Sequence, residues 1–230
     1  KTCQVSHYDR NEVARLFQEL EFINLLPRLP QMKAEGSQPS VGAGLVPAHP
    51  SAVKSPMVNT ETALEQLISE LGKAQGLAIE VETTGEKAMM ADLIGIALSP
   101  TQGKAFYIPL GHQGLNQPPQ LLLTQVTARL KPILENASVG KIAYNGKHVM
   151  AVLAGCGVKI ENLNFDPLLA AYLLGDKNLG FKALVFNKLG VEMATLAELT
   201  GAGKKQGSLS LLEANRVADH ACASVDILWS

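Results

Sequence analysis

The stretch LAIEVETTG, residues 77–85, is an apolar run that ends in two acids one residue apart. Apolar residues alternate along it in the period-two pattern of a strand, so Glu80 and Glu82 should point from the same face. Two carboxylates held that close repel each other unless a positive charge lies between them. The stretch therefore predicts a buried strand that ends at a cation site, either one still in use or one that has been lost.

Composition indicates a globular protein with no strong charge bias. The chain has 230 residues, of which 47% are hydrophobic and 18% charged, and its net charge is −1. This length suits one large domain, or one domain with an appendage. A near-neutral chain lacks the basic excess that phosphate binding by the whole surface requires, which argues against strong nucleic-acid affinity of the fold alone.

Cysteine usage and hydropathy indicate a cytoplasmic protein. Cys3, Cys156 and Cys222 are odd in number and share no metal-ligand spacing, which favours a reducing compartment. No apolar run reaches membrane-spanning length and no signal peptide opens the chain. We therefore expect no membrane partner.

The chain divides into three parts by composition. Residues 10–26 show the apolar spacing of an amphipathic helix, whereas 31–57 are rich in Pro, Gly, Ser and Ala without periodicity. We expect 1–30 to be the tail of an upstream region, 31–57 a flexible linker, and 58–230 the main domain. The missing initiator Met suggests a fragment of a longer protein.

The main domain has the periodicities of a mixed sheet covered by helices. Thr60 is a plausible N-cap for a first helix. We expect strands at 77–82, 91–98, 104–110 and 140–144, a short strand near Val58, and helices at 119–136, 147–155, 166–174, 179–190 and about 210–229.

Two further places join the acid pair as candidates for chemistry. In AYNGKHVMAVL, residues 143–153, Asn145 could cap the helix whose first turn holds His148 and Val149. In the last helix, His220 and Ser224 lie four apart on one face. Taken singly, each place also has an ordinary interpretation: acids facing solvent at a strand end, a partly exposed histidine, and a helix that packs in the core.

Together, the three places resemble in order and spacing the three exonuclease motifs of the proofreading domain of bacterial DNA polymerase I, the family A polymerase. Its first motif, acid–Thr–acid, matches Glu80-Val81-Glu82. Its second, Asn-x-Lys-Tyr-Asp, matches Asn145-Gly146-Lys147-His148-Val149. Its third, a Tyr four residues before an Asp, matches His220 and Ser224.

The likeness extends between the motifs and covers roughly residues 56–230. AFYIPLGH at 105–112, NFDPLLAAYLL at 164–174 and AGKKQGSLS at 202–210 all resemble stretches of that family. The resemblance implies an α/β fold of the ribonuclease-H-like, DnaQ-like 3′–5′ exonuclease class. It also implies that the helix in 1–30 ends a 5′-nuclease region and that a polymerase domain follows, so that the chain is a middle piece of a larger enzyme.

Departures from the motifs bear on the chemistry. In the resembled family, four carboxylates hold two divalent metals. Here Glu80 replaces an Asp, His220 replaces the Tyr, and Val149 and Ser224 stand at two carboxylate positions, so the formal ligand charge falls from about −4 to about −2. We predict that no catalytic residue set is intact and that this domain holds no metal, Glu80 and Glu82 being the only ligands left. We expect the pair to be tolerated because it is partly solvated; burial would instead raise the pKa of at least one member.

The resemblance therefore implies a vestigial exonuclease that supports the polymerase domain of the same chain. The parent would be a DNA-directed DNA polymerase, a Mg²⁺-dependent nucleotidyltransferase of DNA replication and repair that binds DNA, and the fragment would be a monomer. The alternative is an active metal-dependent 3′–5′ exonuclease on DNA or RNA. In that case Glu80, Glu82, His148 and His220 would hold one softer metal such as Zn²⁺ or Mn²⁺.

Overall fold

The computed structural model describes Val13 and residues 16–17, 56–85, 87–114, 117–194 and 208–230. Of the helix expected at 10–26, Val13, Leu16 and Phe17 are helical and the rest lies outside the described residues. The linker expected at 31–57 also lies outside them except at its last two residues, as does most of the Gly/Lys turn at 202–210.

A mixed five-stranded sheet forms the centre of the main domain, as predicted. Its strands are β1 (Gly76–Thr83), β2 (Leu93–Thr101), β3 (Lys104–Pro109), β4 (Gly140–Ile142) and β5 (Leu163–Phe165). They lie in the order β3-β2-β1-β4-β5, where β1, β2 and β3 pair antiparallel and β1, β4 and β5 pair parallel. The strand expected near Val58 is reduced to a single bridge between Met57 and Tyr107. The sequence analysis missed β5, because three residues are too few to show a period and the strand depends on pairing with β4.

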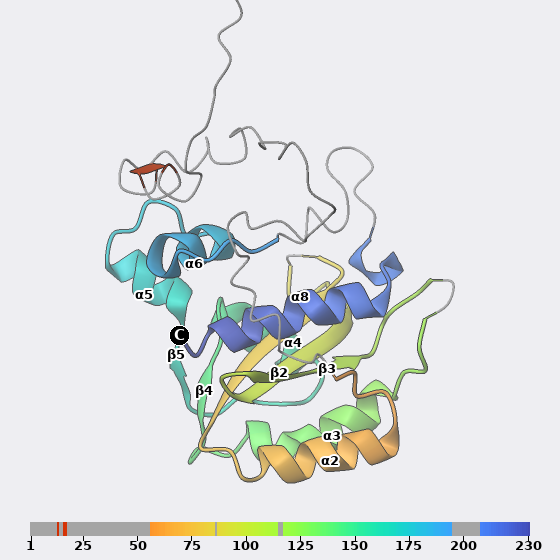
Figure 1. Ribbon diagram of the computed structural model, residues 1–230. Helices are drawn as coiled ribbons and strands as arrows, with labels where there is room; N and C mark the ends of the chain where they lie inside the picture. Colours follow the sequence, from red (N-terminus) through yellow and green to blue (C-terminus); the bar gives the residue numbers. More distant parts are fainter. Residues whose placement is uncertain (1–12, 14–15, 18–55, 86, 115–116, 195–207) are drawn as a thin grey trace, which may run out of the picture.

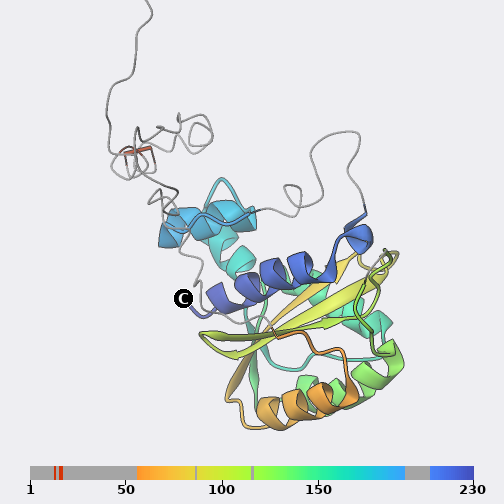
Figure 2. The ribbon, with the colours of Figure 1, turned by 45° about the vertical axis from the view of Figure 1, so that its right-hand side comes forward.

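Helices cover both faces of this sheet (Figure 1). They are α2 (Glu61–Leu71), α3 (Leu123–Leu134), α4 (Gly146–Gly155), α5 (Pro167–Leu173), α6 (Phe181–Leu189), the 3₁₀ turn η2 (Leu209–Leu211) and α8 (Ala214–Ile227). Helix α8 crosses one face over β1, β2 and β3, and α2 and α3 lie side by side on the other (Figure 2). No helix in the described part of the chain combines the length and apolarity needed to cross a bilayer.

Local hydrogen bonds explain where two of these helices begin. The Thr60 hydroxyl accepts from the Ala63 amide at 3.2 Å, which confirms the expected N-cap of α2. Helix α3 begins at Leu123, later than the expected residue 119, because the side chain of Gln120 is hydrogen-bonded to the backbone of His112. Its side-chain amide pairs with both the N–H and the C=O of His112, at 2.9 Å each, and this holds 120 outside the helix.

Two hydrophobic clusters, one on each face, fix the orientation of β1. Leu77, Ile79 and Val81 belong to the cluster shared with α2, α3 and α4. Ala78 belongs to the second cluster, beneath α8. Because side chains alternate along a strand, Glu80 and Glu82 point toward α8 with Ala78. The period-two pattern thus brings the acid pair under the last helix.

Candidate active site

The acid pair is buried where β1 runs beneath α8. Glu82 is only 2% exposed, and Glu80 is half-buried. On β2, Gly95 stands opposite Glu82 in the antiparallel register. A Cβ on Gly95 would lie 2.1 Å from the Tyr107 hydroxyl. A larger residue at position 95 would therefore clash with the Tyr107 side chain. The two carboxyls share a face, as the sequence predicted.

Burial changes the protonation of this pair. The pKa of Glu80 is raised from 4.5 to about 8, chiefly by burial and then by the charge of Glu82, while His220 and the Ser224 hydroxyl partly offset the rise. At neutral pH Glu80 is therefore mainly a neutral carboxylic acid. The expectation that the pair is partly solvated is wrong for Glu82, which α8 closes off from water, whereas Glu80 keeps some exposure.

His220 brings a positive charge to the pair from the last helix. Its Nε2–H donates to the Ala194 carbonyl at 3.1 Å, and its Nδ1 lies 3.9 Å from Oε1 of Glu82. Burial lowers the pKa of His220, but Glu82, Glu80 and the Ala194 carbonyl together raise it above its ordinary value of 6.5. The imidazolium is thereby favoured beside the carboxylate of Glu82.

Ser224 and Val149 come from different helices and pack in different surroundings. Ser224, one turn after His220 on α8, is 1% exposed and close enough to Glu80 to affect its pKa. Val149 lies in the first turn of α4 and packs into the cluster shared with α2 and α3. Of the positions singled out in the sequence, the fold thus gathers Glu80, Glu82, His220 and Ser224, and places an aliphatic side chain at the remaining carboxylate position.

The structure assigns the cap of α4 to a residue other than Asn145. It precedes α4 in the left-handed conformation (φ 53°, ψ 51°), and its side chain makes no capping hydrogen bond. The expectation that Asn145 caps α4 is therefore wrong. Asp166, the residue after β5, caps α4 instead. Its carboxylate accepts hydrogen bonds from the amides of Asn145 (3.1 Å), Gly146 (2.8 Å) and Leu168 (2.9 Å). One side chain thus holds the N-termini of α4 and α5 together.

The donor set does not fit two hard divalent cations. Four buried polar atoms there lack a hydrogen-bond partner: Glu80 Oε2, Glu82 Oε1, His220 Nδ1 and Ser224 Oγ. They belong to an acid whose pKa is raised, a second glutamate, an imidazole whose pKa is raised and an alcohol, whereas Mg²⁺ requires octahedral, mostly anionic oxygen ligands. His148 does not join them; its Nε2 lies 3.5 Å from the Thr83 hydroxyl. Within the described residues, no three His, Cys, Asp or Glu side chains are grouped to hold a metal ion.

A buried Tyr–His pair beneath the acids escaped the sequence analysis. The Tyr107 hydroxyl lies 2.8 Å from Nε2 of His112, and Nδ1 of His112 lies 3.4 Å from the Leu212 carbonyl. Since the carbonyl can only accept, the geometry favours Tyr107 as donor to Nε2. Burial, followed by the nearby charge of Glu82, raises the pKa of Tyr107. The available signal was Tyr107 within the apolar run AFYIPLGH and His112 at the end of that run.

The fold, a mixed sheet flanked by helices, is that of the ribonuclease-H-like exonucleases. Escherichia coli RNase D, an exoribonuclease involved in structured RNA processing, superposes with a TM-score of 0.55 at 20% identity, over 76% of this chain and 42% of its own. The structure titled the POL domain of Pol1 from M. smegmatis, in complex with DNA primer-template and dNTP, superposes with a TM-score of 0.53 at 22% identity, over 75% of this chain and 26% of that one. At such identities the likeness shows the fold.

Sequence similarity identifies the family. A family model described as 3′-5′ exonuclease matches residues 56–209. DNA polymerase I of Chloroflexus aurantiacus is 34% identical over 249 residues, which cover 97% of this chain and 26% of that polymerase. The chain belongs to the 3′–5′ exonuclease domain family of bacterial DNA polymerase I. It spans about a quarter of the length of the curated relatives it matches.

Proposed function

We propose that this chain is the exonuclease-like part of a DNA polymerase I in which the nuclease site no longer holds metals, and that it serves as structural support for the polymerase domain. The observation that carries the proposal is the buried pair of Glu80 and Glu82, whose nearest cation is His220 of the same fold. Val149 and Ser224 stand where the family's motifs place carboxylates.

Protonation of Glu80 supports this proposal on chemical grounds. With Glu80 largely neutral and the pKa of His220 raised, the gathered side chains carry less negative charge than two cations of charge +2 need. Binding a metal would require removing the Glu80 proton and, where the ring is charged, the proton on Nδ1 of His220. Each step opposes metal binding.

The wider role follows from the relatives and is part of the proposal. The curated relatives are DNA polymerases I, so the parent would be a bacterial, cytoplasmic DNA-directed DNA polymerase that acts in replication and repair and uses Mg²⁺ in its polymerase domain. DNA would be bound through that parent. The exonuclease-like part would contribute packing surface instead of cleavage.

One observation favours a second candidate function, an active metal-dependent 3′–5′ exonuclease on DNA or RNA. Four buried polar atoms of Glu80, Glu82, His220 and Ser224 lack hydrogen-bond partners. Such a group of unpartnered atoms is also what a bound ion or water would satisfy. A single softer cation such as Mn²⁺ or Zn²⁺ could accept Glu82, Glu80 after loss of its proton, and Nδ1 of His220 when that nitrogen carries no proton.

A nuclease assay separates the two. We expect no release of the 3′-terminal nucleotide from labelled single-stranded DNA or RNA across a titration with Mg²⁺, Mn²⁺ and Zn²⁺. The matched control is Glu82→Gln, which keeps the shape of the side chain but removes its charge. Release by the natural sequence that disappears in Glu82→Gln would overturn the proposal, whereas release that persists in the variant identifies a contaminating nuclease.

A further inference from the structure

Helix α5 is apolar but leaves most of its surface uncovered. Its sequence is PLLAAYL, and only Ala171 is buried. Tyr172, Leu173 and the following Leu174 are 67%, 82% and 77% exposed. Three more large apolar side chains continue the same surface from the helix and its neighbours, namely Leu169, Phe165 at the end of β5 and Leu189 at the end of α6. We call these six residues the α5 patch.

An apolar cavity of about 300 Å³ adjoins the α5 patch. It lies between α5, α6 and the end of α8, and its lining includes Phe165, Leu174, Phe181, Leu184, Ile227 and Leu228. Lys188 also lines it and pairs with Asp176 at 2.9 Å, so a polar rim borders the apolar floor. A hollow floor beside protruding apolar side chains is the shape that another folded surface can fill.

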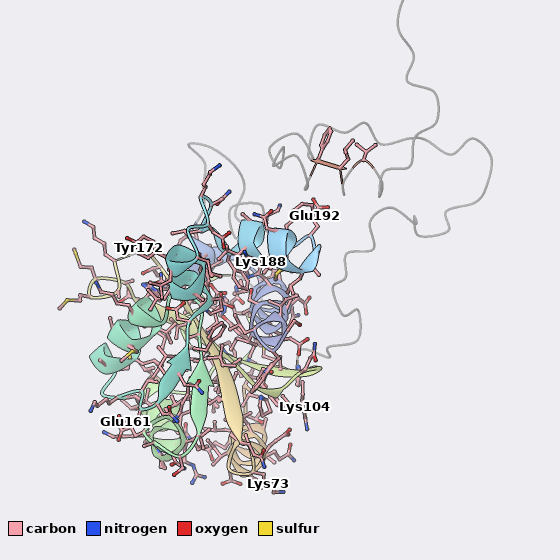
Figure 3. All side chains as sticks on the ribbon, turned by 90° about the vertical axis from the view of Figure 1, so that its left-hand side faces the viewer. Lys73, Lys104, Glu161, Tyr172, Lys188 and Glu192 are labelled. Carbon is pink, nitrogen blue, oxygen red and sulfur yellow. The ribbon has the colours of Figure 1, made fainter. Side chains whose placement is uncertain are left out.

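Such a surface is unfavourable in water. Full burial of one Leu side chain is worth about 1.5–3 kcal/mol, and several neighbouring exposed apolar side chains mark a contact surface on most soluble domains. Figure 3 shows Tyr172 on the outer side of α5. Lys73, which follows α2, lies at the opposite end of the domain. A helix that is apolar all round is normally enclosed by protein, which α5 is not within the described residues.

We propose that the α5 patch and the adjoining cavity dock against the polymerase domain of the same chain. This inference rests on the proposed function, which supplies that domain. Ser230 lines the cavity, and Figure 1 shows the end of α8 beside β5 and α5. Any residues that follow α8 therefore start at this surface, and the Chloroflexus aurantiacus relative is about four times as long as the section matched by this chain.

Covalent attachment favours this occupant over a second copy of the chain. A tethered domain has an effective concentration in the millimolar range, so a small apolar surface is enough to keep it docked. Interfaces between domains of one chain are correspondingly modest, about 600–1,500 Å². A free homodimer would usually need about 1,200–2,000 Å² of total buried surface, more than a short helix with one cavity readily supplies.

Hydrogen exchange tests the proposal. We compare the amides of α5 in the 1–230 chain and in the full-length polymerase encoded by the same gene, with α2, which lies elsewhere on the domain, as internal reference. We expect α5 to exchange about tenfold more slowly in the full-length protein and α2 to be unchanged. Equal exchange of α5 in the two proteins would overturn the proposal.

A pair of double variants makes the test specific. Tyr172→Ser with Leu173→Ser should remove the extra protection and lower the Tm of the full-length protein, while leaving the 1–230 chain as stable as before. Met89→Ser with Met90→Ser, in the turn between β1 and β2, is the matched control because both side chains are also exposed, and it should do neither. A 1–230 chain that dimerises and becomes monomeric only with the α5 variant would instead assign the patch to a second copy. None of these readouts depends on nuclease activity. A failure of the docking proposal is therefore distinguishable from a failure of the proposal that the nuclease site holds no metal.

Discussion

Nδ1 of His220 lies 3.9 Å from Oε1 of Glu82, which places a titratable base of the last helix beside the acid pair of the first strand. Glu82 is 2% exposed and Oε1 has no hydrogen-bond partner, so the imidazolium is the main source of compensating charge. An ionised carboxylate without any such partner would be costly to bury. The position that the family's motif assigns to a Tyr thus serves charge balance in this chain.

The first prediction concerns the pH dependence of stability. The folded-state pKa of Glu80 is about 8, against 4.5 when the group is unperturbed. Between these values the unfolded chain has released a proton that the folded chain keeps, so the free energy of unfolding falls as pH rises, by at most about 1.4 kcal/mol per pH unit. His220 acts in the same direction: its raised pKa stabilises the fold below about pH 6.5, and this contribution is lost as pH rises through the folded-state value.

Glu80→Gln should therefore match the natural chain near pH 4 and exceed its stability at pH 8, because glutamine resembles the protonated acid at every pH. Urea unfolding followed by the fluorescence of Trp229, the single tryptophan, measures this. Glu65→Gln, at an exposed partner of Arg129, is the control and should lack the pH-dependent gain. A gain for Glu80→Gln that is the same at pH 4 and pH 8 would contradict the assigned protonation state.

The second prediction concerns the coupling between His220 and Glu82. His220→Gln removes the cation and leaves a buried carboxylate uncompensated, which should cost about 1–3 kcal/mol of unfolding free energy at pH 6. Glu82→Gln should cost less, because it removes the charge that needs compensation. A double-mutant cycle then gives a favourable coupling energy, which should shrink as the pH rises through the raised pKa of His220 and the ring loses its charge. Additive costs at pH 6 would show that the two groups do not interact.

The third prediction concerns restoration of the metal site. Glu80→Asp, Val149→Asp, His220→Tyr and Ser224→Asp together recreate the family's motif residues, at two half-buried and two buried positions. Without metal this variant should be less stable than the natural chain, since it buries added carboxylates. Saturating Mn²⁺ should raise its Tm, with about 2.7 kcal/mol gained at a hundredfold excess over Kd, and should leave the natural chain unchanged. Calorimetry that detects no Mn²⁺ binding to the variant would show that the motif alignment or the surrounding residues are wrong.

The fourth prediction concerns Asp166, whose carboxylate accepts from three backbone amides at the starts of α4 and α5. Asp166→Ala leaves all three without this partner and should destabilise the domain by about 1–2 kcal/mol, as for other lost caps. Asp166→Asn should cost less, because its one remaining carbonyl oxygen can still serve the two amides bound by Oδ1. Equal losses in the two variants, measured by urea unfolding, would mean that the negative charge matters more than the hydrogen bonds.

Elements with strong local signals were predictable. The alternating run in 77–85 placed β1 and the shared face of its acids correctly, and Thr60 marked the start of α2. Features that are short, or that depend on pairing with a distant segment, could not be predicted from the sequence. Strand β5 exists through its bonds with β4, and the start of α3 is set by a side chain that reaches across eight residues to His112.

The sequence by itself determined the family, the order of the motif-like stretches and the presence of Val149 and Ser224 in them, because residue identity and spacing are properties of the chain. Only the tertiary structure decided the protonation of Glu80, the role of His220 as counter-ion, the replacement of Asn145 by Asp166 as the cap of α4, and the exposure of α5. Charge state and exposure depend on which distant segments cover a side chain, and a helix more than 130 residues away, α8, is what removes water from the strand end of β1.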